Sequence, residues 1–149
     1  MKTGIVLDRK IRNLLERAVD FHGHLGPFVT LGVRLALAGL RETSTRGDRS
    51  KLHITVALEN CLPFSCAVDG IQVVTGCTIG NKRLKIRRGE SLAATFQIEG
   101  VKSVRVIVKK VAFDDLKRRV LSQRLTSDRL RKVALDIASM SEKCLFTIH

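Results

Sequence analysis

The sequence predicts an α+β protein in which a mixed, largely antiparallel sheet is flanked by helices. Apolar residues recur at three- and four-residue spacing before residue 44 and again after residue 114, which indicates helices in both parts. Between residues 52 and 108 they alternate with polar residues, which indicates strands, except for a helical pattern at 66–75. At 149 residues, with no internal repeat or linker, the chain is expected to form one domain, residues 1–149.

Two helices are expected first. Asp8 is a suitable N-cap for an amphipathic helix that follows it. Pro27 suits the first turn of a second helix, over residues 28–40, and Arg34 is the only charge in that helix, so it is expected to be buried. The connection between the helices is FHGHLGP, residues 21–27, which is too rich in Gly and Pro for a helix interior.

The middle of the chain carries the predicted strands. An alternating strand at 52–58 places His53 on the side opposite its apolar residues, and Ser65 is the expected cap of the helix at 66–75. Turns at Gly89 and Gly100 separate three further strands, predicted to form an antiparallel meander. These strands lie at residues 84–86, 92–98 and 104–108, followed by helices starting at Asp114 and at Thr126 or Ser127 and by an edge strand at 145–148.

The net charge of +13 is concentrated in the second half of the chain. Residues 1–81 carry ten Lys and Arg against seven Asp and Glu, while residues 82–149 carry seventeen against seven. A basic nucleic-acid-binding module with structural cysteines is therefore one hypothesis, based on the runs at 81–88 and 116–119. However, alternation places the first run on the solvent side of a strand, and no aromatic residues are interleaved for base stacking.

The sequence predicts a cytoplasmic protein without a membrane segment. Charges interrupt the N-terminal region before an apolar signal-peptide core can form, and no window approaches the roughly eighteen apolar residues that cross a bilayer. In the cytoplasm, the four cysteines are expected to be free, metal-bound or catalytic rather than paired in disulfides.

Two separated motifs supply the candidate site. Residues 59–81 contain three of the four cysteines, and the FHGHLGP loop contains two of the four histidines. Imidazole nitrogen and thiolate sulfur together suit a transition metal, with zinc the first candidate. Cys66 would lie in the first turn of its helix, where the dipole and free amides favour the thiolate, so a thiol enzyme with Cys66 as nucleophile and a histidine base is an alternative.

These motifs resemble the FmdE family of formylmethanofuran dehydrogenase subunits. The resemblance rests on FHGHLGP, LGVRLAL, SCAVDGIQVVTGCTIGN and the final LFTI, in this order over most of the chain. It implies an α+β domain, often dimeric, with a metal or active site built from the histidine loop and the cysteine helix, in association with a larger oxidoreductase. The chain has no CxxC pair after Asn81, so it resembles single-domain members without a C-terminal zinc ribbon.

The resemblance also selects site residues. Gly26 stands where many members have cysteine, and Cys61 is the candidate to replace that thiol in space. Because the resemblance is to an accessory protein of the dehydrogenase, it does not imply that this chain oxidises formylmethanofuran. The expected metal ligands are His22, His24, Cys61, Cys66 and Cys77, with Asp69, Gln72 and Thr78 also matching the family pattern.

Structural roles remain open for several of these residues. Cys77 is equally well explained as a small buried packing residue, and His22 or His24 as satisfying a backbone group. Asp69 either orients a histidine or faces solvent. Two further histidines, His53 and His149, stand outside both motifs and are expected to have no role in the site.

Overall fold

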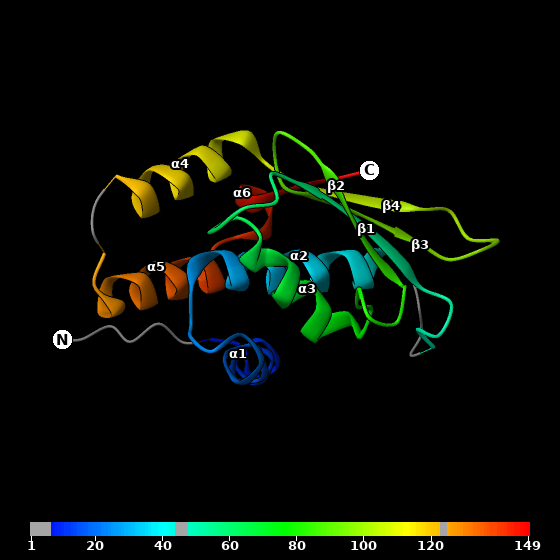
Figure 1. The fold of residues 1–149 in the computed structure, drawn as a ribbon, viewed down its shortest axis with the longest axis horizontal. Helices are drawn as coiled ribbons and strands as arrows, with labels where there is room; N and C mark the ends of the chain where they lie inside the picture. Colours follow the sequence, from blue (N-terminus) through cyan, green and yellow to red (C-terminus); the bar gives the residue numbers. More distant parts are fainter. Residues whose placement is uncertain (1–6, 44–47, 123–124) are drawn as a thin grey trace.

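The computed structural model describes residues 7–43, 48–122 and 125–149. It confirms the α+β class, with helices on one side of a single sheet (Figure 1). No helix in the described ranges is long and apolar enough to cross a membrane. In chain order the elements are α1 (Arg9–His22), α2 (Pro27–Thr43), β1 (His53–Leu58), α3 (Cys66–Thr75), β2 (Leu84–Arg88), β3 (Ala93–Gln97), β4 (Val104–Val108), α4 (Lys110–Leu121), α5 (Ser127–Ser139), α6 (Glu142–Leu145) and β5 (Phe146–Ile148).

The strand order is β2-β1-β3-β4-β5, which corrects the predicted meander. β3 and β4 do form an antiparallel pair, but β1 lies between β2 and β3 and runs parallel to β2. The cause is α3, which follows β1 and provides the crossover that a parallel pair requires. β5 completes the sheet as an edge strand against β4, as the sequence predicted.

One face of the sheet forms the core. Ile54, Val56 and Leu58 of β1 are at most 1% exposed, and their neighbours on β3 and β4 are buried in the same layer. α2 packs on this face against β3 and β4, and α3 and α5 pack on α2. His53, Thr55 and Ala57 alternate with the buried residues and are exposed or half-buried, so the opposite face of the sheet is left open.

Most helix boundaries agree with the sequence. The Asp8 side chain accepts from the amides of the first turn of α1, and the Thr126 hydroxyl accepts from Arg129 N at 3.3 Å. Ser65 precedes α3 as predicted, but it has helical dihedrals and makes no side-chain capping bond. α4 begins at Lys110, earlier than the predicted start at Asp114, because apolar residues of its first turns already contact the core.

α2 and α3 cross with their backbones in direct contact. An ideal Cβ built on Gly32 would lie 2.0 Å from the carbonyl oxygen of Ala67 on α3. In the same way, a Cβ on Gly70 would lie 2.2 Å from the carbonyl oxygen of Val29 on α2. Only glycine fits at these two positions, and the short spacing holds the cysteine helix against the helix that follows the histidine loop.

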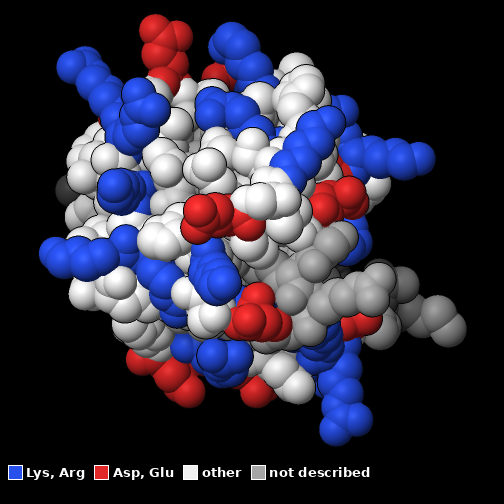
Figure 2. Space-filling model, turned by 90° about the vertical axis from the view of Figure 1, so that its right-hand side faces the viewer, with Lys and Arg blue, Asp and Glu red and all other residues white. Residues whose placement is uncertain are grey.

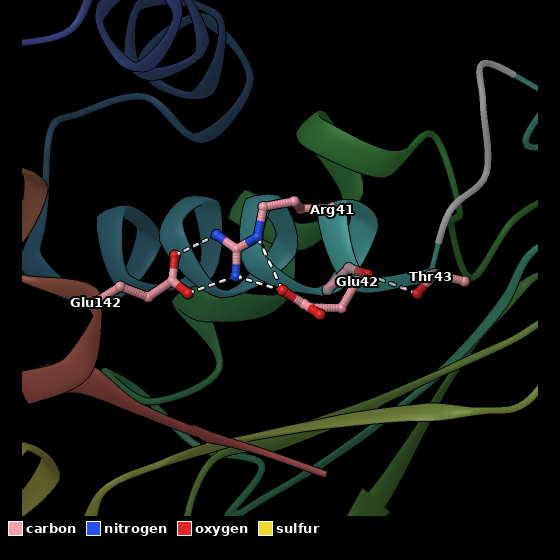
Figure 3. A network of polar contacts seen from close by, with 5 residues as sticks. Arg41, Glu42, Thr43 and Glu142 are labelled. Atoms are coloured by element: carbon pink, nitrogen blue, oxygen red, sulfur yellow. Dashed lines mark hydrogen bonds and ion pairs between the residues drawn. The ribbon is translucent and has the colours of Figure 1, made fainter.

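Two arginines of α2 hold the C-terminal part of the chain. Arg34 Nη1 donates to the carbonyl oxygens of Ile137, Ala138 and Met140 at 3.0, 2.9 and 2.8 Å, where α5 ends and its carbonyls lack helical partners. Arg41 lies between Glu142 of α6 and Glu42 (Figure 3), and its two Nη atoms donate to the Glu142 carboxylate at 2.7 and 2.6 Å. This bond lowers the pKa of Glu142.

Candidate functional site

The two motifs meet through a histidine and an aspartate. His22 is the last residue of α1, and Gly23 follows it with a φ of +104°, the left-handed conformation that lets the chain leave the helix. His22 Nδ1 lies 2.6 Å from Asp69 Oδ2 on α3, where it can donate to the carboxylate. The side chain of His22 is only 10% exposed, so this bond forms in a largely buried position.

Asp69 is itself held in place from within α3. Gln72 Nε2 donates to Asp69 Oδ1 at 3.4 Å, and Gln72 Oε1 accepts from Ile79 N at 3.2 Å. The loop after α3 is further tied by mutual bonds between Thr78 and Asn81. The carboxylate that orients His22 is thus part of a chain of hydrogen bonds running back to the residues after α3.

The other ring nitrogen of His22 has no partner. Nε2 is buried and makes no hydrogen bond within the described part of the chain. Because Nδ1 donates to Asp69, this tautomer leaves Nε2 with a free lone pair. The ring centroid of His24 lies 4.8 Å from that of His22, so the two imidazoles share one place.

Gly26 lies directly beneath His24. An ideal Cβ built on Gly26 would be 3.1 Å from His24 Nε2, which is a tight contact with the end of an exposed side chain. A residue with a side chain at this position would therefore point at the imidazole. In many proteins with the resembling motif, a cysteine stands here.

Cys66 is the first residue of α3 and lies one helical turn before Asp69. Burial raises its pKa, and the nearby negative charge of Asp69 raises it further. The expectation of a stabilised thiolate is therefore wrong for the metal-free protein, because burial and Asp69 outweigh the helix N-terminus. A neutral thiol is a poor nucleophile but remains a metal ligand, since a cation displaces its proton.

Cys66 is expected to react slowly with iodoacetamide near neutral pH in metal-free protein. Its raised pKa moves the pH-dependent rise in alkylation to higher pH than for an unperturbed thiol. Asp69→Asn removes a charge that raises this pKa, so the variant is expected to react faster at a given pH. Peptide mass spectrometry with labelled iodoacetamide measures the rate at Cys66; Asp128→Asn, on another helix, is the control and should leave it unchanged.

The remaining cysteines lie elsewhere. Cys77 follows the far end of α3, is 0% exposed, and its Sγ lies 3.3 Å from the Leu52 carbonyl oxygen. Cys61 is exposed on the loop before α3, near Glu59 and Lys117, and Cys144 is exposed on α6. Within residues 7–43, 48–122 and 125–149, no three His, Cys, Asp or Glu side chains are placed so that they could hold a metal together.

Sequence reasoning found the main residues but not how they connect. It left Asp69 either beside a histidine or in solvent, and the structure places it against His22. It matched Gln72 to the family pattern without giving it a role. The spacing of Asp69 and Gln72, three residues apart on one helix, was the signal for their contact.

Comparison with known proteins agrees with this arrangement. Over 102 residues the chain is 37% identical to the "Probable S-adenosyl-L-methionine-binding protein" of Archaeoglobus fulgidus, covering 66% of this chain but only 27% of that longer protein. The fold is similar to that of an FmdE-like protein of tungsten formylmethanofuran dehydrogenase from Syntrophus aciditrophicus, with a TM-score of 0.62 and 19% identity over 93% of this chain and 70% of that one. The family model described as FmdE, Molybdenum formylmethanofuran dehydrogenase operon, matches residues 21–147, and the chain belongs to this FmdE family.

Proposed function

We propose that this FmdE-family protein is a metal-binding accessory protein, linked in its role to formylmethanofuran dehydrogenase, that binds a transition metal at the histidine loop and the cysteine helix. Zinc is the first candidate, and His22, His24 and Cys66 are the proposed ligands. The observation that carries the proposal is the buried, unpartnered Nε2 of His22 beside a second imidazole.

The His22–Asp69 pair supports metal binding on chemical grounds. A histidine that ligates a metal usually donates its other ring nitrogen to a carboxylate, which fixes the tautomer and makes the ligating nitrogen more basic. His22 has this arrangement, with Nδ1 2.6 Å from Asp69. An unpaired buried nitrogen costs free energy in the metal-free protein, and a bound cation would recover that cost.

His24 and Cys66 are the nearest further donors. His24 is exposed on a Gly-rich loop, so its ring can turn toward a cation held at His22. Cys66 shares a helical face with Asp69 and is half-buried. Two or three protein ligands leave a coordination position open, as in catalytic rather than structural zinc sites. A zinc ion there would act as a Lewis acid and lower the pKa of bound water.

The competing thiol-enzyme hypothesis receives less support. A nucleophilic cysteine needs a lowered pKa or a hydrogen-bonded base, whereas the pKa of Cys66 is raised. Cys77 has no part in the proposed site, since it is buried against Leu52. Cys61 stays outside it as well, because it lies beside Lys117 and Glu59.

The proposal extends to setting and assembly. The family description names a formylmethanofuran dehydrogenase operon, which supports association with a larger oxidoreductase complex. Self-association as a homodimer is the second assembly that we propose. All four cysteines are free, which suits a reducing cytoplasmic compartment.

Equilibrium dialysis with elemental analysis tests the metal site. The purified chain is expected to bind about one zinc ion, and His22→Ala is expected to weaken zinc binding at least as much as Asp69→Asn, for which about 10- to 100-fold is expected from loss of the orienting carboxylate. His53→Ala is the matched control, since His53 is an exposed histidine on the open face of the sheet. Equal zinc binding by the His22→Ala and His53→Ala variants would contradict the proposal.

A gain-of-ligand variant gives an independent check. Gly26→Cys is expected to place a thiol beside His24, because a Cβ at residue 26 would lie 3.1 Å from His24 Nε2. The added donor should raise zinc affinity by about tenfold or more, and with Co²⁺ as a probe it should add a sulfur-to-metal absorption band. An unchanged cobalt spectrum would mean that this loop does not hold the metal.

A further inference from the structure

We propose that the open face of the sheet is a second binding site, for a small phosphorylated molecule, on the side opposite the histidine loop and the cysteine helix. The site is the hollow of about 430 Å³ over β1, β2 and β3, near β4. Its volume lies within the range of small-molecule pockets. It is lined by Thr55, Ala57, Arg87, Arg88, Gly89, Thr95, Gln97 and Arg105.

The strand register explains why the face is hollow. One row across the sheet reads Lys85, Thr55, Thr95 and Arg105. The next row reads Arg87, Ala57, Ala93 and Ile107. Short side chains therefore occupy the two central strands, and longer ones rise from the strands on either side. Neighbouring strands lie about 4.8 Å apart, so the flanking cations of the first row stand about 14 Å apart at their backbones.

The charge of the hollow is positive and uncompensated. No Asp or Glu lines it, and Lys85, Arg87, Arg88 and Arg105 form no ion pair among the described residues. The segments outside the described ranges contain no Asp or Glu, so they supply no compensating side chain. Figure 2 shows Lys and Arg spread around the side of the molecule on which the sheet lies.

The chemistry of the lining points to phosphate. Guanidinium groups match phosphate oxygens with paired hydrogen bonds, and hydroxyl and amide groups complete the donor set. The Arg105 guanidinium already lies over the sheet, donating to Thr95 Oγ1 at 3.2 Å. Two exposed arginines of β2 stand across the hollow from it. A phosphate group bound between them would be held from both sides.

Two other occupants fit less well. A second copy of the chain would bring like charges together, because each copy would present its own Lys85, Arg87 and Arg105. Single-stranded nucleic acid is usually bound with aromatic side chains that stack on the bases, and no aromatic residue lines this hollow. A small phosphorylated molecule needs only the arginines and the short central side chains.

Calorimetric titration with pyrophosphate tests the site on the intact chain. Arg87→Gln and Arg105→Gln are each expected to weaken binding by about tenfold or more, the usual effect of losing a hydrogen bond to a charged group. Arg131→Gln makes the same charge change on α5, away from the sheet, and should leave the affinity unchanged. No pyrophosphate binding at millimolar concentration, or equal weakening in all three variants, would overturn the proposal.

A measurement on the unaltered protein removes any dependence on variant folding. Pyrophosphate is expected to protect Arg87 and Arg105 from modification by phenylglyoxal while Arg131 stays reactive, as read by peptide mass spectrometry. Protection of none of these arginines, or of all three alike, would count against the site. Binding of a single-stranded oligonucleotide without any binding of pyrophosphate would replace it with a nucleic-acid surface, a distinct result from failure of the metal site.

Discussion

Gly70→Ala is expected to destabilise the protein by about 3 kcal/mol or more, a large part of the stability of a domain of this size. The added methyl group would lie 2.2 Å from the Val29 carbonyl oxygen and 2.7 Å from the Val33 amide nitrogen, both backbone atoms of α2. Backbone cannot turn aside as a side chain can, so α3 must move away from α2. Urea unfolding followed by circular dichroism measures the loss.

Gly80→Ala is the matched control for this substitution. A Cβ on Gly80 meets Thr78 Oγ1 at 3.7 Å, an ordinary contact, so its effect should stay within about 0.5 kcal/mol. The Gly70→Ala variant is also expected to lose zinc binding, because Asp69 precedes the displaced residue. Equal stability of the two alanine variants would show that the helices do not cross as described.

Arg34→Met is expected to cost about 3 kcal/mol in the free energy of unfolding. Methionine keeps the apolar stem of the arginine but removes the donor that serves the carbonyls of Ile137, Ala138 and Met140. These oxygens then lack a charged partner at the C-terminal end of α5. Thermal and urea unfolding are both expected to shift to lower values.

Two variants bracket the role of Arg34. Arg34→Lys keeps a charged donor and should recover part of the loss, since all three bonds come from the single Nη1 atom. Arg131→Met, at an exposed position of α5, should change stability by less than about 0.5 kcal/mol. If lysine at residue 34 were no more stable than methionine there, the carbonyl bonds would not be the source of the effect.

Local periodicity predicted most elements of the fold because each depends on nearby residues. The helix from Pro27, the strand at 52–58 and the helix at 66–75 all appear where apolar spacing placed them. Strand order could not be read in the same way, because a period of two identifies a strand without naming its partner. The parallel pairing of β1 with β2 arises from the α3 crossover, a matter of topology.

The candidate site was predicted in part for a similar reason. The motifs pointed to His22, His24 and Cys66, but the contact between His22 and Asp69 joins residues that are 47 positions apart. The thiolate prediction for Cys66 considered the helix terminus alone and missed the burial of the residue and the charge of Asp69. Arg34 similarly looked like an isolated charge in an apolar helix, since its carbonyl partners lie more than 100 residues away.

The crossing of α2 and α3 leaves no compressible layer of side chains between the two segments that carry the candidate site. Where Gly32 meets Ala67 and Gly70 meets Val29, peptide groups set the separation. Core substitutions elsewhere can repack rotamers without altering that distance. The relative placement of the histidine loop and the cysteine helix is therefore insulated from ordinary sequence drift, and it will be most sensitive to the two glycines, neither of which bears a functional group.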